Sequence, residues 1–317
     1  MRLNKQKTSI KWPAPLILIL ISGSILLLGG DFLLHNNDTK IKAQGILSQD
    51  TLPTAINSTI PIQAHLSTST AGISPTNGSI NQPTTTTSNY GITLPPGSPL
   101  PGDSTCASRV TTSSFEPRPD NYSANHRIPT TQQIALLHSG SGDNTVPYTT
   151  RKRVTGDYTG TTDEIFQWAG CKWGIGVNII RAQAVMESYW HQSQRGDYTT
   201  NQSLCPPGTW NGKGCYQSYG ILQIKYIYSK TTWPMSGEDT AFNVDYAYSY
   251  IRACYEGLIS YLYEMTPVSG YPRYHVGDIW GCVGSYYSGG WYDRGAINYI
   301  NQVKAYRTDK VWLQPGF

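Results

Sequence analysis

The chain has 317 residues with 24 Lys and Arg against 20 Asp and Glu, a formal net charge of +4. Four cations, Arg2, Lys5, Lys7 and Lys11, precede the first apolar run, so the rest of the chain carries 20 cations and 20 anions. Without a basic excess we expect no nucleic-acid partner, and the 23 Tyr and 9 Trp suit an uncharged or weakly charged sugar polymer better.

The first 43 residues have the features of an export segment. Two apolar runs, 16–21 and 25–28, follow the basic start. The apolar stretch from Ala14 to Gly30 has 17 residues, slightly fewer than the roughly 20 that span a bilayer, and no clean Ala-x-Ala cleavage site follows. We therefore predict either a cleaved signal peptide or an uncleaved signal-anchor that holds the chain in the membrane. In both cases the remaining residues lie outside the cytoplasm, secreted or anchored at the cell surface.

Residues 44–105 are dominated by Ser, Thr, Pro, Asn, Gln and Gly. Such a stretch cannot bury enough apolar surface to offset its ordering entropy, and we predict a disordered linker. About 60 flexible residues have an r.m.s. reach of roughly 40–45 Å, which suits a tether. The residues that follow are enough for a single globular domain.

Six cysteines all lie beyond the linker, at positions 106, 171, 205, 215, 254 and 282. An even number in an exported chain favours disulfides, although six cysteines allow fifteen pairings. One pair flanks a short loop rich in Pro and Gly, a second lies on neighbouring predicted helices, and the third would clamp the start of the domain. We predict the disulfides Cys205–Cys215, Cys254–Cys282 and Cys106–Cys171. No Cys-x-x-Cys or paired His spacing favours zinc, so we expect no metal and no cofactor.

The globular part begins with an irregular arm, residues 106–160. Thr161 and Glu164 then form a capping-box pattern, which predicts a helix over 163–173. Asn178 can cap a second helix over 179–190. Residues 195–216 form an insertion rich in Gly, Pro and Asn, and a turn follows at 218–223.

Three more helices follow the turn. The longest spans 241–265, although Gly257 weakens it near its end. Asp278 can cap a short helix, and the last helix spans 294–306. No segment shows sustained strand alternation. The class is mainly α, with room for a small hairpin near the insertion.

Glu187 is the residue best placed for chemistry. On the second helix it shares a face with Ile180, Gln183 and Ala184, so it lies where an apolar stripe meets a cleft. An apolar setting raises a carboxyl pKa and keeps the proton available near neutral pH. The alternative is a solvated helix glutamate that contacts His191.

Four blocks in order resemble a known family. The first block is 184–188 (Ala-Val-Met-Glu-Ser), and the second is 218–223 (Ser-Tyr-Gly-Ile-Leu-Gln). The third is a predicted helix at 243–251. The fourth, at 286–303, consists of Tyr-Tyr-Ser-Gly-Gly and then Tyr-Ile-x-x-Val. Together they are similar to the soluble lytic transglycosylase domain of the lysozyme-like superfamily. The resemblance implies an α+β lysozyme-like domain over 161–317.

The resemblance also implies that Glu187 is the catalytic acid and then the base of a peptidoglycan-cleaving enzyme. The bond cut is the β-1,4 bond between N-acetylmuramic acid and N-acetylglucosamine. Attack by the muramic acid C6 hydroxyl gives a lytic transglycosylase, which we favour, whereas attack by water gives a lysozyme. The partner would be a peptidoglycan glycan strand, and we expect a monomer. Residues expected to bind the substrate are Ser218, Tyr219, Gly220, Gln223 and Tyr287.

The chain departs from the family pattern in ways that affect the site. Ser288 stands where the family has Asn, Ser218-Tyr219 where it has Ala-Gly, and Ala247 where it has Gly. A second carboxylate that positions water, as in goose-type lysozymes, would come from one of four residues: Asp197, Glu238, Asp239 or Asp245. Asp239 is alternatively a helix N-cap and Asp245 a solvated helix residue.

Other readings of the same residues stay open. Gln223 would orient a sugar through its amide or simply satisfy the turn. Ser218 would bond the substrate or only hold the turn, and Tyr287 would lie beside Glu187 or a sugar or be a core aromatic without a function. Sugar stacking is expected near three tryptophans: Trp190, Trp210 and Trp291. The alternatives to a transglycosylase are a lysozyme-type hydrolase, a chitin hydrolase on the same scaffold and a non-catalytic wall-binding module of the same fold.

Overall fold

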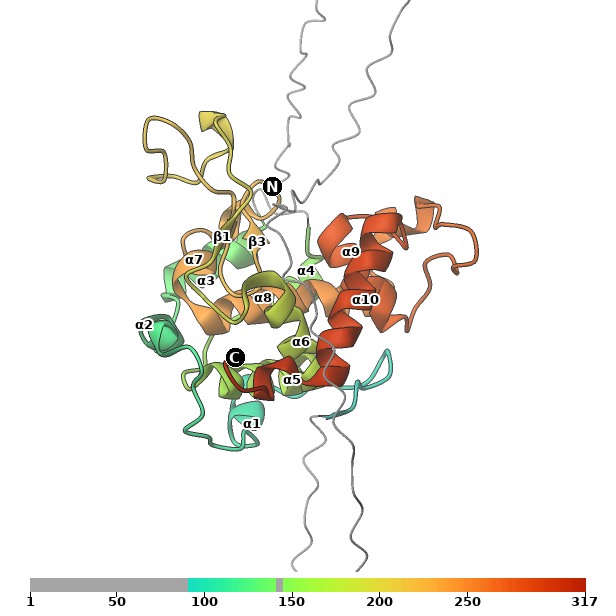
Figure 1. Cartoon of the computed structure of the whole chain (residues 1–317), viewed down its shortest axis with the longest axis horizontal. Coiled ribbons are helices and arrows are strands. Elements are labelled where there is room, and N and C mark those ends of the chain that lie inside the picture. Colours follow the sequence, from blue (N-terminus) through green and yellow to red (C-terminus); the bar gives the residue numbers. More distant parts are fainter. Residues whose placement is uncertain (1–90, 141–144) are drawn as a thin grey trace, which may run out of the picture. The chain divides into compact units, whose positions relative to one another are not determined.

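Residues 91–140 and 145–317 are described by the computed structural model, and most of their elements are helices (Figure 1). This confirms the mainly α class. The five longer helices of the core are α5 (Thr162–Trp173), α6 (Val177–Ser188), α8 (Thr240–Tyr255), α9 (Ile279–Ser288) and α10 (Arg294–Asp309). The other α-helices are α1 (Asp103–Ala107), α2 (Tyr122–Asn125), α3 (Thr131–Ser139), α4 (Tyr148–Arg151) and α7 (Met235–Glu238). Short 3-10 turns cover Pro119–Asn121, Gln202–Leu204, Lys230–Thr232, Ser260–Glu264 and Val311–Leu313.

Helix α5 begins at the predicted capping box. Thr161 Oγ1 accepts from the Glu164 amide at 3.3 Å, and Glu164 Oε2 accepts from the Thr161 amide at 2.9 Å. These two bonds satisfy amides that a helix start leaves without partners. Gly174 ends the helix with φ of 59°, a left-handed conformation that glycine adopts at little cost.

Helix α6, which carries Glu187, differs from its prediction at both ends. Gly176 is its N-cap, and the predicted capping by Asn178 is wrong because Asn178 lies inside the first turn, where its Oδ1 accepts from Arg181. The helix ends at Ser188 rather than at Trp190, since Tyr189 and Trp190 have φ of 55° and 68°. Glu187 therefore lies in the last turn of α6.

Helix α8 begins where Asp239 Oδ1 accepts from the Phe242 amide at 2.7 Å, so the N-cap role considered for Asp239 is confirmed. It ends at Tyr255, ten residues earlier than predicted. Gly257, with φ of 79°, turns the chain away from the helix axis and leads into the connection to α9, which contains the 3-10 turn Ser260–Glu264.

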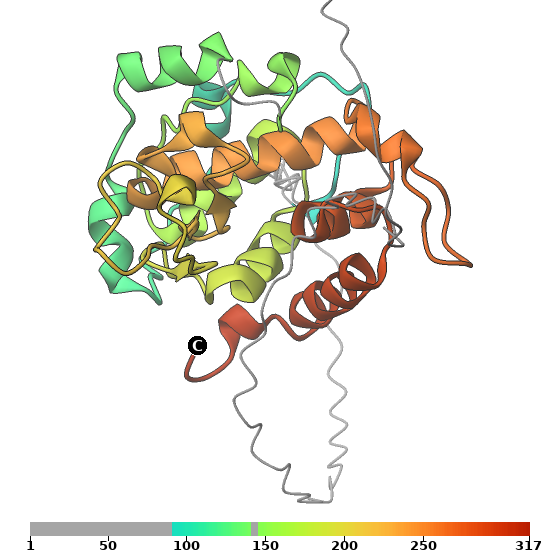
Figure 2. The same ribbon diagram turned by 90° about the horizontal axis from the view of Figure 1, so that it is seen from above.

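Helices α9 and α10 start at capping aspartates. Asp278 caps α9, as predicted, by accepting from the Gly281 amide at 2.9 Å. Asp293 caps α10, which starts at the predicted Arg294 and continues three residues past Tyr306. Helix α10 packs on both α6 and α9, and α5 packs on α6 and α8 (Figures 1 and 2).

The domain begins earlier than the predicted linker boundary at residue 105. The Leu94 amide donates to the Gly174 carbonyl at 2.9 Å, and the buried Arg252 guanidinium donates to the carbonyls of Leu94 and Pro95. The linker prediction is thus wrong for residues 91–105. Leu94 and Leu100, isolated in a polar stretch, both lie against Gly174 and fix the segment to the domain.

The arm at 106–160 is also more regular than expected, because α2, α3 and α4 lie within it. Thr130 and Gln133 form a second capping box at the start of α3. The predicted export segment, residues 1–43, and most of the linker lie outside the described residues. Among residues 91–140 and 145–317, no helix is both long and apolar enough to cross a membrane.

All three predicted disulfides are confirmed. Their Cα–Cα distances are 5.5 Å for Cys106–Cys171, 5.8 Å for Cys205–Cys215 and 5.6 Å for Cys254–Cys282. Three disulfides are typical of a protein that folds in an oxidising, extracytoplasmic environment.

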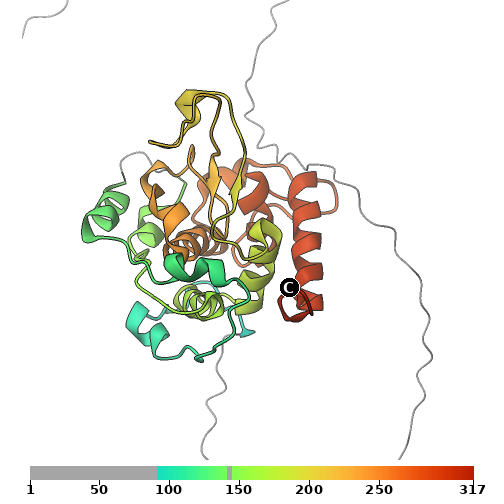
Figure 3. The ribbon, with the colours of Figure 1, turned by 60° about the vertical axis from the view of Figure 1, so that its left-hand side comes forward.

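A small antiparallel sheet fills the place of the predicted hairpin (Figure 3). Its strands are β1 (Arg195–Gly196), β2 (Ser218–Tyr219) and β3 (Ile224–Lys225), in that order. Gly196 pairs with Ser218 and Ser218 with Lys225, and a further bridge joins Thr199 to Cys215. The loop closed by Cys205–Cys215 projects from this sheet away from the helices, as Figures 1 and 3 show.

Candidate active site

Glu187 lies half-buried in the last turn of α6, facing α10. Its Oε1 accepts a short hydrogen bond from the hydroxyl of Tyr299. Burial raises the pKa of the Glu187 carboxyl from 4.5 to about 7, the Tyr299 hydroxyl lowers it in part, and the negative charge of Asp197 raises it further. The alternative contact with His191 is wrong, because His191 pairs with Asp120 at 3.1 Å.

Tyrosines form the wall behind this carboxyl. The rings of Tyr287 and Tyr299 stack with centroids 4.6 Å apart and planes 6° from parallel. Tyr286 donates to the Leu222 carbonyl at 2.6 Å. Burial holds the pKa of Tyr299 and of Tyr286 well above 10, so both hydroxyls stay protonated and act as donors. Tyr287, expected to bind the substrate, thus lies beside the ring that contacts Glu187.

The turn at 218–223 is fixed to the end of α6. Ser188 Oγ donates to the Ile221 carbonyl at 2.8 Å. Gln192 Oε1 accepts from the Ile221 amide and Asn243 Oδ1 from the Leu222 amide, both at 2.9 Å. These buried bonds satisfy turn amides that would otherwise be without partners.

Gly220 is the one position of this turn that needs glycine. Its φ is 82°, and a Cβ there would overlap Asn243 Nδ2 and the Ser236 carbonyl. Gly220 was predicted to bind the substrate. In the structure it is needed for the shape of the turn, because the turn backbone lies close to α8.

Ser218 and Tyr219 were both expected to bind the substrate, but the sheet places them on opposite faces, since successive strand residues alternate. Ser218 Oγ donates to Asp197 Oδ2 at 2.6 Å. The Tyr219 ring packs on Trp233 with centroids 4.6 Å apart, and its hydroxyl donates to the Tyr216 carbonyl. Tyr219 is therefore committed to packing, whereas Ser218 binds the carboxylate of Asp197.

Asp197 is the carboxylate that joins Glu187 at the site. It follows β1 with φ of 55°, and its Oδ2 lies 2.9 Å from Lys225 Nζ as well as accepting from Ser218. Its charge raises the pKa of both Glu187 and Tyr287, so it is near enough to act on both groups.

The other three candidates for a second carboxylate are engaged elsewhere. Asp245 is fully buried, 2.7 Å from Lys172 Nζ and accepting from the Trp173 indole, so the solvated-residue alternative is wrong. Glu238 pairs with Arg127 at 2.6 Å. Asp239 caps α8, and burial raises its pKa to about 8.

Gln223 lies on the same side of the sheet as Ser218. Its Nε2 donates to the Gly220 and Gln194 carbonyls at 2.8 and 3.1 Å. These bonds agree with the alternative in which the Gln223 amide satisfies polar groups of the turn. Its Oε1 lies so close to Gly196 that a Cβ there would collide with it. Gln223 thus closes the turn with its nitrogen and directs its oxygen towards the start of the sheet.

Two tryptophans expected to stack on sugars cannot do so. Trp190 and Trp291 are buried, and their indoles donate to the carbonyls of Arg181 and Pro272. Trp210 is half-exposed within the loop closed by Cys205–Cys215.

Tyr299 is the important site residue to which the sequence analysis gave no role. It follows Ala296 by three residues and precedes Val303 by four, so helical spacing places it on the buried stripe of α10. A tyrosine on an apolar stripe signals a buried hydroxyl that needs a partner, but the spacing does not identify Glu187 as that partner.

In residues 91–140 and 145–317, no cluster of three or more His, Cys, Asp or Glu side chains suits a metal ion. No family model, curated protein or solved structure matches the chain.

Proposed function

We propose that this protein is an extracytoplasmic glycosidase of lysozyme-like fold that cleaves the β-1,4 bond between N-acetylmuramic acid and N-acetylglucosamine in peptidoglycan. One observation carries the proposal: Glu187 is half-buried and accepts from the Tyr299 hydroxyl, and burial raises its pKa to about 7, so it can hold a proton near neutral pH. The motif blocks that suggested this activity also meet in space, because Ser188 bonds the turn and Tyr299 bonds Glu187.

Protonated Glu187 gives its proton to the glycosidic oxygen as the bond breaks. The carboxylate that remains accepts the Tyr299 hydrogen bond, which stabilises its charge within a buried setting. The substrate's own N-acetyl group can take the place of a carboxylate nucleophile. Glu187 then removes a proton from the attacking hydroxyl. When that hydroxyl is C6–OH of the muramic acid, the product is the 1,6-anhydro sugar of a lytic transglycosylase.

Asp197 favours a second candidate, a lysozyme-type hydrolase. Ser218 and Lys225 both bind its Oδ2, which fixes the carboxylate, and its charge raises the pKa of Glu187. A carboxylate held opposite a general acid can direct a water at the sugar from the other side. The same fold without turnover, a wall-binding module, is the third candidate.

The chemical form of the product separates these candidates. The full-length chain is incubated with purified peptidoglycan sacculi, beside its Glu187→Gln variant, and the soluble products are weighed by mass spectrometry. Anhydromuropeptides from the wild type alone support the transglycosylase, and reducing-end muropeptides support the hydrolase. Binding to sacculi with no soluble product from either protein would refute both enzymes.

A further inference from the structure

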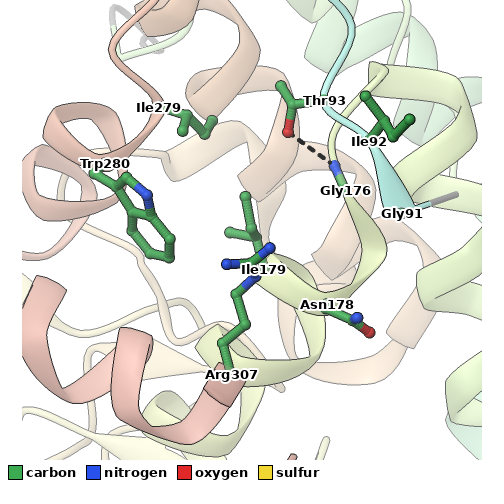
Figure 4. Close-up of a pocket in the computed structure, with 9 residues that line it drawn as sticks. All are labelled: Gly91, Ile92, Thr93, Gly176, Asn178, Ile179, Ile279, Trp280 and Arg307. Atoms are coloured by element: carbon green, nitrogen blue, oxygen red, sulfur yellow. Dashed lines mark hydrogen bonds between the residues drawn. The ribbon is translucent and has the colours of Figure 1, made fainter.

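A cavity of about 290 Å³ lies at the start of α6, at the far end of that helix from Glu187 (Figure 4). Three isoleucines on separate segments contribute apolar surface to it: Ile92, Ile179 and Ile279. The volume is near the lower end of ligand pockets, which hold about 300–1,000 Å³. The cavity is therefore large enough for a small molecule or the end of a chain, and too small for a folded partner.

The polar side chains that line the cavity offer mainly donors, because the one amide oxygen among them, Asn178 Oδ1, already accepts from Arg181. Arg307 reaches in from α10 and Trp280 from α9, and Figure 4 shows both side chains bordering the same space. The Thr93 hydroxyl accepts from the Gly176 amide at 3.1 Å, which leaves its own proton to donate. Guanidinium and indole groups have no acceptor. The lining contains no Asp or Glu.

Two positive charges lie over one ring at the edge of this cavity. The Lys304 ammonium is 4.9 Å from the centre of the Trp280 ring, and the Arg307 guanidinium carbon is 5.9 Å from it. In the part of the chain that the structure describes, neither cation forms an ion pair with a carboxylate. An anionic group entering the cavity would meet a guanidinium without a competing acid.

We propose that this cavity binds a small carboxylate with an apolar group beside it, such as the C-terminal end of a short peptide with small side chains. Arg307 holds the carboxylate, and the isoleucines accept the neighbouring apolar group. A bare phosphate shares the oxyanion chemistry but leaves the apolar surface unused, so the mixed lining favours the carboxylate.

The relation to Glu187 suggests where such an end would come from, and this step rests on the proposed function. Ile179 and Glu187 are eight residues apart on α6, or about 12 Å along the axis. Four extended residues reach about 13–14 Å. A short peptide borne by a glycan strand at Glu187 has the length to reach the cavity.

Calorimetric titration of the full-length chain tests the site without any turnover. Three probes are compared: acetyl-alanyl-alanine with a free carboxylate, the same dipeptide as a carboxamide, and inorganic phosphate. We expect the free carboxylate to bind, and the carboxamide to bind at least tenfold more weakly. Arg307→Gln should weaken binding of the carboxylate about tenfold, as expected for the loss of a charged hydrogen bond.

Arg273→Gln is the matched control, because Arg273 is exposed and outside the cavity. Its affinity for the dipeptide should equal that of the wild type. Phosphate binding more tightly than the dipeptide would overturn the carboxylate assignment, and so would binding that is absent or insensitive to Arg307. Since the titration needs no catalysis, an inactive protein that binds the dipeptide would refute the proposed function and leave the cavity's ligand established.

Discussion

The hydroxyl of Tyr299 donates to the carboxyl of Glu187 across the contact between α10 and α6, from a position 112 residues further along the chain. The Tyr299 ring stacks on the Tyr287 ring, and this contact restricts the position of the Tyr299 hydroxyl. A buried hydroxyl of this kind favours the ionised form of the carboxyl, whereas burial favours the protonated form. The balance of these two effects sets the pH at which Glu187 loses its proton.

Tyr299→Phe should move that balance towards the protonated form. The lost hydrogen bond raises the pKa of Glu187 above its wild-type value of about 7. A general acid works only while protonated, so the wild-type rate falls as the pH rises through about 7, and the fall in the variant moves to higher pH. The pH dependence of kcat/KM on sacculi measures this. Tyr306→Phe, on the same helix but without a bond to Glu187, is the control, and equal profiles for all three proteins would contradict the account.

Asp197→Asn should shift the fall of kcat/KM with rising pH in the opposite direction, to lower pH. Removing the negative charge lowers the pKa of Glu187, so the loss of activity begins at lower pH than in the wild type. The size of the rate loss separates the two enzymes. A transglycosylase should keep its rate within about tenfold, whereas a hydrolase that depends on Asp197 to direct water should lose about 100-fold or more.

Glu187→Gln should stabilise the protein at alkaline pH. The folded pKa of about 7 exceeds the ordinary glutamate value of 4.5, so the stability of the wild type is greatest below pH 4.5 and decreases as the pH rises through about 7. A neutral glutamine does not ionise. We expect the variant to gain up to about 3 kcal/mol in free energy of unfolding at pH 8, and close to nothing at pH 4. Urea unfolding at both pH values gives the comparison, and an equal gain at both would be evidence against a raised pKa.

Gly220→Ala should disrupt the turn that holds the site. Its left-handed φ costs an alanine about 1–2 kcal/mol, and the added Cβ also overlaps Asn243 and the Ser236 carbonyl. Gly208→Ala is a matched control, because Gly208 has φ of 79° and open space around its Cβ position. We expect Gly220→Ala to lower the free energy of unfolding by at least about 2 kcal/mol more than Gly208→Ala. Similar losses would show that the close approach of α8 does not constrain the turn.

Local sequence signals predicted the features that depend on a few neighbouring residues. The capping box at Thr161 and the caps at Asp239 and Asp278 all follow from spacings of three residues. The pair Cys205–Cys215 was predictable from the short loop it flanks. Cys254–Cys282 was predicted from neighbouring helices, and Cys106–Cys171 was the pair that remained.

Features that depend on tertiary packing were not predictable in the same way. Asp197 is itself left-handed, it follows Gly196, which pairs with Ser218 in the sheet, and its side chain accepts from Ser218, 21 residues later. The opposite orientations of Ser218 and Tyr219 could not be predicted, because their strand is only two residues long and its sequence shows no alternation of apolar and polar residues. Leu94 and Leu100 fix residues 91–105 to the domain although the composition around them is that of a linker.

The most direct test is the rate at which Glu187→Gln releases soluble fragments from sacculi, measured with its affinity for the same sacculi. Glu264→Gln serves as the matched control, because Glu264 is an exposed glutamate outside the site. The account predicts that Glu187→Gln binds sacculi as the wild type does and releases fragments at least about 1,000-fold more slowly, the loss expected when a general acid is removed. A rate within tenfold of the wild type, from a variant that is folded and bound, would contradict the central role of Glu187.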